Sequence, residues 1–555
     1  MAPRGCSRNG INRMTFLQLV RREMYGSLPR LVFMAGLGGS STAALLAAIN
    51  AGAQAASNSE KVGLWAPGLF LVALFLFIKC QNYILITATV EIQSIIHKMR
   101  VRILDEVRHS ELGPLEHIGR ARIVGAITAD TAVLAQAASM LAFSIQSVVL
   151  VILVGFYVAY LSFVAFLIAM SIVALSSGIF YLRGRQIAAG QQEAAEWTNR
   201  LFDRLIDVLD GFKEVRLNKS RSDELIEMVS DVSSTAAYLK IKTEADNFKR
   251  MLLSQISMYV LLGGVVFVAP QLSSASSGSI SKAILALLFV VGASFGLVQS
   301  MPMFASANAA ADRIAKLEAD LLATVRSADL SVADQPKHFG LIEMRNITYR
   351  YFDKSAEATF QIGPLDFTLR SGELVFITGG NGSGKSTFLK VLAGLYLPEG
   401  GQIMLDGMRI DDETREQYRA LITTIFTDYH LFQRLYGIPS PDLAEVQRLL
   451  TDFRLNAKTR LADGEFRTLD LSSGQRKRLA LIVAMLEKRP ILLLDEWASD
   501  QDPEFRRKFY HEMLRDLNQA GVTVVAVTHD DRFINEVDLP ARRLHMEDGR
   551  IVSQA

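Results

Sequence analysis

The sequence predicts an α-helical membrane domain of six spans, followed by an α/β domain that carries a phosphate-binding loop. Hydrophobic residues make up 50% of the chain, and the long apolar stretches lie before Leu322. After that point, short apolar strands alternate with amphipathic helices, which is typical of an α/β domain with a largely parallel sheet. The run Gly379–Thr387 fits the phosphate-binding pattern G-x-x-x-x-G-K-[ST].

Six N-terminal stretches reach the length of about 20 apolar residues that a membrane helix requires. They are Leu31–Ala51, Pro67–Thr89, Met140–Tyr160, Phe163–Leu182, Leu252–Leu272 and Ala283–Phe304. Lysine and arginine are frequent in the N-terminal segment and in the loops after the second and fourth stretches, whereas the other loops contain only Lys61 and Lys282. Because positively charged loops stay on the cytoplasmic side, both termini are predicted to face the cytoplasm.

A cleaved signal peptide is the rival interpretation of the N-terminus, since Ala51–Ala56 resembles a small-residue cleavage site. A signal peptide has an apolar core of about 7–15 residues and a total length of about 15–30 residues. Here the polar segment before Leu31 is already that long, and the apolar run that follows is long enough to span a membrane. The pattern therefore favours a membrane span.

The composition argues against several other classes of protein. The two cysteines, Cys6 and Cys80, are too few for a disulfide framework. The net charge of +2 does not point to a nucleic-acid partner, and none is predicted. No cluster of cysteine and histidine has the spacing of a transition-metal site.

The predicted domain boundaries follow the change in composition. Residues 1–322 form the membrane domain, residues 323–340 form a polar linker of mixed charge that contains Pro336, and residues 341–555 form the nucleotide-binding domain.

The phosphate-binding loop lies between a predicted strand, Leu374–Ile377, and a predicted helix that starts at Phe388. Its glycines let backbone N–H groups surround a phosphate at a helix N-terminus. Lys385 is expected to reach the β- and γ-phosphates, and the Ser386 hydroxyl to bind magnesium. The predicted nucleotide-binding residues of this loop are Gly379, Asn381, Gly382, Gly384, Lys385, Ser386 and Thr387.

Four further motifs resemble those of ABC transporter ATPases. Leu471–Arg476 is similar to their signature sequence, Ile491–Glu496 to their Walker B strand with its catalytic glutamate, and Thr528–Asp530 to their switch histidine segment. Tyr351 lies where that family stacks an aromatic ring on adenine. The motifs follow the family's order, and the six preceding spans match its type IV exporter architecture. The resemblance, which covers nearly the whole chain, implies a six-span helical membrane domain followed by an α/β ABC-type P-loop ATPase domain.

Asp495 ends an apolar strand beside the loop, where a carboxylate can hold magnesium. The resemblance implies ATP and Mg²⁺ as cofactors. It also implies that Glu496 orients and deprotonates the attacking water, that His529 contacts the γ-phosphate, and that the signature helix faces the nucleotide of a second subunit. The signature residues are Ser472, Ser473, Gly474 and Gln475. Because the chain carries only one set of these parts, it is expected to be a half-transporter that forms a homodimer.

Three positions depart from the family pattern. Thr427, followed by Asp428, stands where most relatives carry the Q-loop glutamine, and Asp428 is the candidate substitute at the magnesium and nucleotide site. Ser473 replaces a glycine of the signature. The D-loop, Trp497–Asp502, reads Trp-Ala-Ser-Asp-Gln-Asp in place of the family's common serine-alanine-leucine-aspartate. The segments Phe426–Phe432 and Asp495–Asp502 resemble those of bacterial cyclic-peptide and siderophore exporters, of the pyoverdine and lasso-peptide-microcin types. Because these segments belong to the ATPase, they indicate the substrate only by association.

Two cytoplasmic segments, Leu115–Arg120 and Gly211–Arg216, look like the family's contacts between membrane helices and ATPase domains. The alternative is that they are ordinary solvated helix turns.

Polar residues within the spans are candidates for a substrate path. Lys79 lies about 18 Å along the second span from Pro67, near mid-membrane, where a charge is expensive and by default functional. It could instead pair with a neighbouring span or reach a water defect. The other candidates, which could equally form interhelical hydrogen bonds, are Gln81, Asn82, Gln146, Gln255 and Gln299.

The sequence therefore favours ATP-driven export of a cyclic or otherwise modified peptide, or a peptide siderophore, across the bacterial cytoplasmic (inner) membrane by a homodimer with alternating access. The alternatives are a flippase for lipids or lipopolysaccharide precursors, and an importer or ATP-gated sensor.

Overall fold

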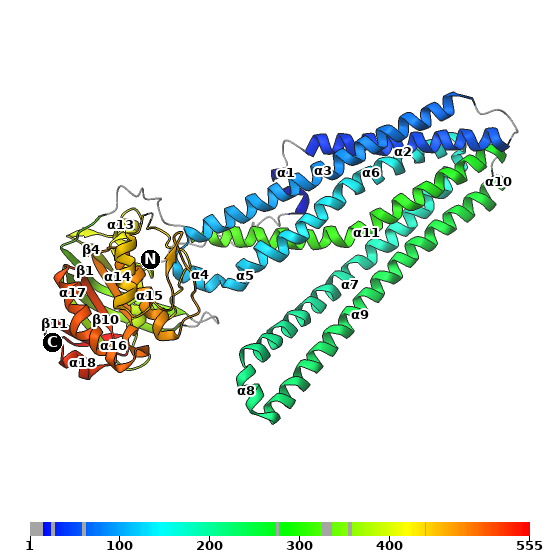
Figure 1. The fold of residues 1–555 in the computed structure, drawn as a ribbon. Coiled ribbons are helices and arrows are strands. Elements are labelled where there is room, and N and C mark those ends of the chain that lie inside the picture. Colours follow the sequence, from blue (N-terminus) through cyan, green and yellow to red (C-terminus); the bar gives the residue numbers. More distant parts are fainter. Residues whose placement is uncertain are drawn as a thin grey trace, which may run out of the picture. The chain divides into compact units, whose positions relative to one another are not determined.

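The computed structural model describes residues 15–23, 28–57, 63–272, 277–324, 336–352, 358–438 and 440–554 (Figure 1). The chain divides into two compact units. The helical unit comprises Met1–Arg102 and Val124–Leu317, and the α/β unit comprises Ile103–Ile123 and Glu318–Ala555.

Each of the six predicted spans falls in a separate helical stretch, and the expectation of a helical N-terminal domain is confirmed. The helices are α1 (Phe16–Glu23), α2 (Leu28–Ser57), α3 (Trp65–Arg108), α5 (Arg120–Gly125), α6 (Thr131–Leu161), α7 (Phe163–Asp210), α8 (Phe212–Leu217), α9 (Lys219–Gly263), α10 (Ala269–Leu272) and α11 (Ser277–Leu322). Two π-helical turns interrupt the series, η1 (Ala126–Asp130) and η2 (Gly264–Val268).

Among the described residues, four helices are long and apolar enough to cross a membrane. They are Pro29–Ala55, Trp65–Arg108, Arg120–Leu161 and Lys219–Leu272. Two further apolar segments, Phe163–Leu175 and Ser281–Gly292, are shorter. The number of six spans therefore stays a prediction.

Small residues allow close packing within the helical unit. A Cβ atom on Gly39 of α2 would lie 2.9 Å from the carbonyl oxygen of Gln146 on α6 and 3.0 Å from Cγ1 of Val149. Helices in a membrane associate through such close contacts. Because lipid is as apolar as the helix surfaces, burial of apolar surface does not favour their association. Figure 1 shows α7 and α9 running side by side and joined at α8.

Two sheets form the centre of the α/β unit. The four-stranded sheet has the order β2-β1-β4-β5, from β1 (Leu341–Phe352), β2 (Ala358–Arg370), β4 (Gly400–Leu405) and β5 (Met408–Arg409). The six-stranded sheet has the order β12-β11-β3-β10-β9-β6, from β3 (Leu374–Gly379), β6 (Ile422–Ile425), β9 (Ile491–Asp495), β10 (Thr523–Val527), β11 (Ala541–Glu547) and β12 (Arg550–Gln554). All of its strand pairs are parallel except β11–β12.

The central strands are continuous apolar runs because helices cover both faces of a parallel sheet. All five residues of β9 and of β10 are buried. The surrounding helices are α12 (Lys385–Leu392), α13 (Arg415–Ala420), α14 (Leu443–Asp452), α15 (Ser473–Leu486), α16 (Pro503–Lys508), α17 (Leu514–Gln519) and α18 (Asp531–Asn535), with the turns η4 (Trp497–Asp500) and η5 (Phe509–Met513) and the hairpin β7–β8 (Leu461–Ala462, Glu465–Phe466). The predicted α/β domain is thus confirmed.

The division into units differs from the predicted domains in two respects. Residues 318–322, predicted as the end of the membrane domain, group with the α/β unit. Residues 103–123, with helix α4 (Leu112–Ile118), group with the α/β unit, because α4 packs against it. Helix α11 ends at Leu322 and β1 begins at Leu341, and residues 325–335 of the predicted linker lie outside the described residues.

Candidate nucleotide-binding site

The predicted site residues come from the carboxyl ends of parallel strands. Strand β3 ends at Gly379, β9 ends at Asp495, and β10 is followed by Thr528 and His529. Strand β6 leads into Thr427 and Asp428. Since these strands are parallel, their carboxyl ends meet at one edge of the sheet, which is where open α/β sheets bind ligands.

The loop after β3 requires glycine at two positions. Gly379 has φ 144° and Gly384 has φ 95°, conformations that side chains other than glycine rarely adopt. A Cβ atom on Gly379 would lie 2.1 Å from the carbonyl oxygen of Met546, and one on Gly384 would lie 2.8 Å from Cγ2 of Ile362. The loop therefore presents backbone to its ligand. Asn381, Gly382 and Ser386 are exposed, and Thr387 is half-buried.

Lys385 begins helix α12 and is held over the loop. Its Nζ atom donates hydrogen bonds to the carbonyl oxygens of Gly379, at 3.0 Å, and Gly380, at 2.8 Å. Burial lowers the pKa of Lys385, and the neighbouring carboxylates of Glu496 and Asp495 oppose that effect. The ammonium group is thus fixed beside the space that the loop encloses.

Asp495 carries the feature that best fits a divalent cation. Its side chain is 1% exposed, and neither carboxylate oxygen accepts a hydrogen bond of normal geometry from a described residue. Burial raises the pKa of Asp495, Glu496 and Asp428 raise it further, and Ser386 and Lys385 oppose the rise. A buried carboxylate without hydrogen bonds is costly, and a hard cation such as Mg²⁺ with oxygen ligands would satisfy it.

Glu496 and His529 form a contact at the same edge. The Nε2 atom of His529 lies 3.1 Å from Oε1 of Glu496. The backbone of Glu496 has φ 49°, in the left-handed region, and its N–H donates to the carbonyl oxygen of Val527 at 3.1 Å. Such conformations are uncommon outside glycine and cluster at functional sites.

The signature residues begin α15, and no hydrogen bond or ion pair joins them to the phosphate loop among the described residues. The Ser472 side chain accepts from the N–H of Gln475 at 3.4 Å, and Oε1 of Gln475 accepts from the N–H of Ser472 at 3.2 Å, which is a capping box. Ser472 and Ser473 are exposed, and Gly474 is half-buried. They are available to a ligand outside this chain's own loop.

No role was predicted for three buried residues that lie in or against the signature helix α15. Lys477 donates from Nζ to the carbonyl oxygen of Glu496 at 2.9 Å and lies 2.8 Å from Oδ2 of Asp500. Trp497 is 1% exposed, and its Nε1 atom donates to the carbonyl oxygen of Lys477 at 2.8 Å. The centroids of the Trp497 and Phe509 rings are 4.6 Å apart. The unusual D-loop tryptophan is thus a core residue that ties the signature helix to the end of β9. Arg478 likewise donates to Gln501 at 2.8 Å.

Tyr351 lies near the end of β1. It pairs with Phe360 of β2, and a Cβ atom on Gly384 would lie 3.0 Å from Cε1 of that phenylalanine. Tyr351 is 42% exposed, whereas the nearby Tyr349 is stacked on Tyr396 with ring centroids 4.8 Å apart. Of the two tyrosines, Tyr351 has the more accessible ring.

Helix α4 is joined to the α/β unit by two glutamates. Glu111, 3% exposed, accepts from Nη1 of Arg415 at 3.3 Å and from Nη2 of Arg419. Oε2 of Glu116 accepts from the Tyr396 hydroxyl at 2.6 Å. Glu116 lies within the predicted segment Leu115–Arg120. Glu111 lies just before it and was missed, since a lone glutamate gives no local signal of burial.

The second predicted contact segment, Gly211–Arg216, forms most of α8 in the helical unit. Its contact with an ATPase domain stays a prediction.

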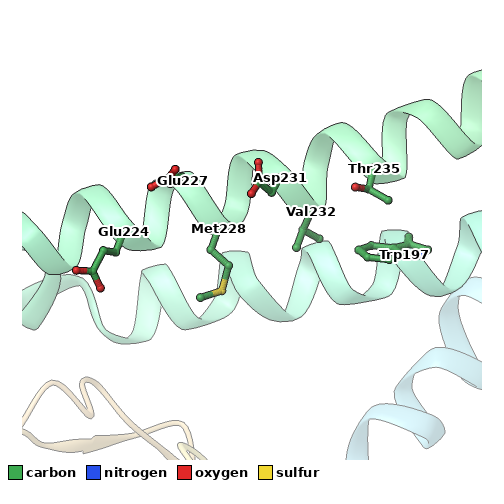
Figure 2. Close-up of a pocket in the computed structure, with 7 residues that line it drawn as sticks. All are labelled: Trp197, Glu224, Glu227, Met228, Asp231, Val232 and Thr235. Carbon is green, nitrogen blue, oxygen red and sulfur yellow. The ribbon is translucent and has the colours of Figure 1, made fainter.

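A separate cavity of about 410 Å³ lies between α7 and α9 of the helical unit (Figure 2). Its lining residues are Trp197, Glu224, Glu227, Met228, Asp231, Val232 and Thr235. It contains none of the predicted site residues.

Comparisons with known proteins agree with this geometry. The family model described as "ABC transporter" matches residues 362–499. The ATP-binding protein SyrD of Pseudomonas syringae pv. syringae is 33% identical over 558 residues, which cover 96% of each protein. The probable syringafactin export ATP-binding/permease protein SyfD of P. syringae pv. syringae strain B728a is 32% identical over 231 residues, or 38% of this chain and 34% of that protein.

A solved structure of a bacterial Atm1-family ABC exporter with ATP bound is similar in fold. The TM-score is 0.73 and the sequence identity is 20%, over 97% of this chain and 95% of that chain. The similarity therefore extends over both units.

Proposed function

Since this chain belongs to the ABC transporter family, as an exporter half-transporter with membrane helices and one ATPase domain, we propose that it exports a cyclic or otherwise modified peptide, or a peptide siderophore. The chain is an ATP-driven exporter and a membrane-embedded protein, and its ATP hydrolysis is coupled to transport. The peptide substrate, the bacterial cytoplasmic (inner) membrane as the location, and the homodimer are parts of the proposal.

The observation that carries the proposal is the similarity to SyrD along nearly the whole of both proteins, membrane helices included. A second relative has export in its description. The segments Phe426–Phe432 and Asp495–Asp502, which resemble those of cyclic-peptide and siderophore exporters, support the same substrate class.

In the proposed ATPase cycle, Lys385 and the backbone of the loop bind the β- and γ-phosphates, and Tyr351 stacks on the adenine. Ser386 and Asp495 hold Mg²⁺, with Asp428 close to them. The ion, when bound, neutralises the charge on the β- and γ-phosphate oxygens. The orphaned oxygens of Asp495 support this assignment.

Glu496 acts as the general base that takes a proton from the attacking water. His529, in contact with Oε1 of Glu496, orients that carboxylate and reaches the γ-phosphate. Lys477 and Trp497 keep the end of β9 fixed to α15, so that the position of Glu496 depends on the signature helix.

Homodimer formation would complete two such sites. The exposed residues Ser472 and Ser473, with Gly474 and Gln475, would bind the nucleotide held by the other copy. ATP then favours the closed dimer, and this preference drives the membrane helices from one orientation to the other. Helix α4, held by Glu111 and Glu116, would transmit the motion.

Mass spectrometry of spent medium and cell extract tests the proposal in cells that carry the wild type or Glu496→Gln. Loss of a peptide from the medium, with accumulation inside the variant cells, would establish peptide export and identify the substrate. Glu512→Gln is the matched control, because Glu512 is exposed and outside the site, and it should keep export intact. Unchanged peptides with an altered outer-leaflet lipid profile would instead indicate a flippase.

A further inference from the structure

Lys79 is the only charged side chain within the six predicted spans. The stretches Leu31–Ala51, Met140–Tyr160, Phe163–Leu182, Leu252–Leu272 and Ala283–Phe304 contain no aspartate, glutamate, lysine or arginine, and Pro67–Thr89 contains Lys79 alone. Lys79 also lies close to the middle of its stretch. A second copy of the chain would have the same spans. Neither copy therefore offers a carboxylate at this depth.

The contacts of Lys79 agree with the sequence. It is exposed on the helical unit, where its Nζ atom lies 5.6 Å from the centroid of the Phe75 ring, and no carboxylate pairs with it among the described residues. A cation–π contact recovers only part of the cost of a membrane-buried charge. The ammonium group thus needs water or an anion that its neighbours among the described residues do not supply.

Two more polar side chains lie on the same face of α3. Asn82 and Tyr83 follow Lys79 at spacings of three and four residues, which places all three together on a helix surface. Asn82 is exposed and Tyr83 is 37% exposed. The face of α3 that packs inside the unit is different and mostly apolar, with Ala73, Cys80, Ile84 and Ala88 buried.

The other polar candidates do not join this face. Gln146 packs between helices, since Nε2 would lie 3.6 Å from a Cβ atom on Gly38. Gln255 donates to the Tyr259 hydroxyl of its own helix at 3.4 Å. Gln81 is half-buried, with its Oε1 atom buried, and the side chain of Gln299 lies outside the described residues.

An apolar stripe runs beside the polar group, and other exposed apolar residues of α3 lie closer to Lys79. Leu71, Ile78 and Leu85 recur every seven residues and are all exposed. At about 100° per residue, this stripe lies roughly 80–120° around the helix from Lys79. Val72, Phe75 and Ile86 are also exposed and lie within about 40° of Lys79 around the helix. The polar group is therefore set in an apolar surface, where lipid alone would not satisfy the charge.

We infer that Lys79, Asn82 and Tyr83 form an anion-binding subsite in the substrate path, which binds a carboxylate of the exported peptide at mid-membrane. The inference rests on the proposed export function and adds a chemical class to its substrate. Lys79 supplies the positive charge, and the Asn82 amide and Tyr83 hydroxyl are hydrogen-bond donors that orient the carboxylate.

Thiol labelling tests the geometry without any ligand. Replacing the chain's two cysteines (Cys6→Ser, Cys80→Ala) leaves a cysteine-free full-length protein into which Lys79→Cys is introduced. A membrane-impermeant, charged thiol reagent should label this variant in nanodiscs. Two variants on the apolar stripe should stay unlabelled: Ile78→Cys, at nearly the same depth, and Leu85→Cys, about 9 Å further along the helix. Failure to label position 79 with and without ATP would place it in lipid and overturn the inference.

ATP turnover then tests the chemistry. The probes are a synthetic cyclic lipopeptide with one free carboxylate and its carboxamide analogue, added to protein in phosphatidylcholine nanodiscs. For the carboxylate peptide, Lys79→Gln should raise the concentration for half-maximal stimulation by about 10- to 100-fold, the value of a charged hydrogen bond. The carboxamide peptide should show no such change, and Lys79→Arg should keep the preference for the carboxylate. Lys282→Gln, which removes a lysine just before the sixth span, is the control.

The outcomes separate the inference from the proposed function. Equal responses of wild type and Lys79→Gln to the carboxylate peptide would overturn the subsite and leave peptide export intact. A wild type that responds to neither peptide would overturn peptide export, and the subsite with it. If phosphatidylglycerol in the nanodiscs stimulates in a Lys79-dependent way and the peptides do not, the anion is a lipid headgroup and the peptide assignment is wrong.

Discussion

The Nε2 atom of His529 lies 3.1 Å from Oε1 of Glu496, although the two residues are 33 positions apart. Their contact follows from the strand register, in which Val527 of β10 pairs with Asp495 of β9. The residues that follow the two strands therefore emerge side by side. A carboxylate oriented by an imidazole is a suitable general base, because its free oxygen can be aimed at a water molecule.

Replacing Glu496 by glutamine should slow ATP hydrolysis by about 10²- to 10⁴-fold, the usual contribution of a general base. ATP binding should persist, because the phosphate loop and Lys385 are unchanged. Steady-state turnover and equilibrium binding of labelled ATP would measure the two effects, with Glu512→Gln as the control. Turnover near the wild-type rate in Glu496→Gln would contradict the assignment of the base.

Asp495→Asn should stabilise the protein without nucleotide, because it removes a buried carboxylate whose oxygens have no hydrogen bonds of normal geometry. The expected gain is about 1–3 kcal/mol in the free energy of unfolding. Thermal unfolding with ATP should be compared in Mg²⁺ and in EDTA, because a ligand that binds only the folded state stabilises it. Wild type should gain stability from Mg²⁺ and Asp495→Asn should not. An equal gain in both would exclude Asp495 as a magnesium ligand.

Asp428 is expected to act in place of the Q-loop glutamine. Asp428→Asn should raise the Mg²⁺ concentration needed for half-maximal ATP turnover several-fold, because one carboxylate near Asp495 is lost. Adding Thr427→Gln to the same variant should restore part of the affinity. Asp538→Asn, which removes an exposed aspartate elsewhere, should change nothing. Unaltered magnesium dependence in Asp428→Asn would show that this carboxylate is not used.

Glu111→Gln should uncouple ATP hydrolysis from export and destabilise the protein. Glu111 is buried between Arg415 and Arg419, and the glutamine would lose charge-assisted hydrogen bonds worth about 1.5–3 kcal/mol. The two arginines would keep Asp412 and Glu416 as partners. The melting temperature and the ratio of peptide exported to ATP hydrolysed would both fall. Glu116→Gln, at the more exposed Tyr396 contact, should have a smaller effect. Wild-type values of both quantities in Glu111→Gln would refute the coupling role.

Trp497→Ser should destabilise this protein by about 3–5 kcal/mol. The reason is the cavity left beside Phe509 and the lost hydrogen bond to the Lys477 carbonyl oxygen. Trp497→Phe should cost less, because it keeps most of the packing. Chemical denaturation followed by circular dichroism would compare them. Equal stability of the serine variant and wild type would show that the neighbouring loop refills the space.

Local patterns were sufficient for much of the fold and the site. The glycine spacing around Lys385, the apolar strand that ends at Asp495, and the length of the apolar stretches each have a short-range cause. A phosphate loop needs backbone N–H groups at a helix start, a central strand needs apolar residues on both faces, and a span needs about 20 apolar residues. Each of these features is determined by residues that are close together in the sequence, so the sequence alone was enough to predict it.

The contacts that tie the site together depend on strand order and helix packing, which no local pattern encodes. Glu111 meets Arg415 across 304 positions, His529 meets Glu496 because β10 lies beside β9, and Trp497 is buried because α16 and η5 pack around it. For Lys79, the sequence alone showed that it is the only charged residue in the predicted spans. The tertiary packing decided that Cys80 faces inward and Lys79 outward, because only one side of α3 can face its neighbouring helices.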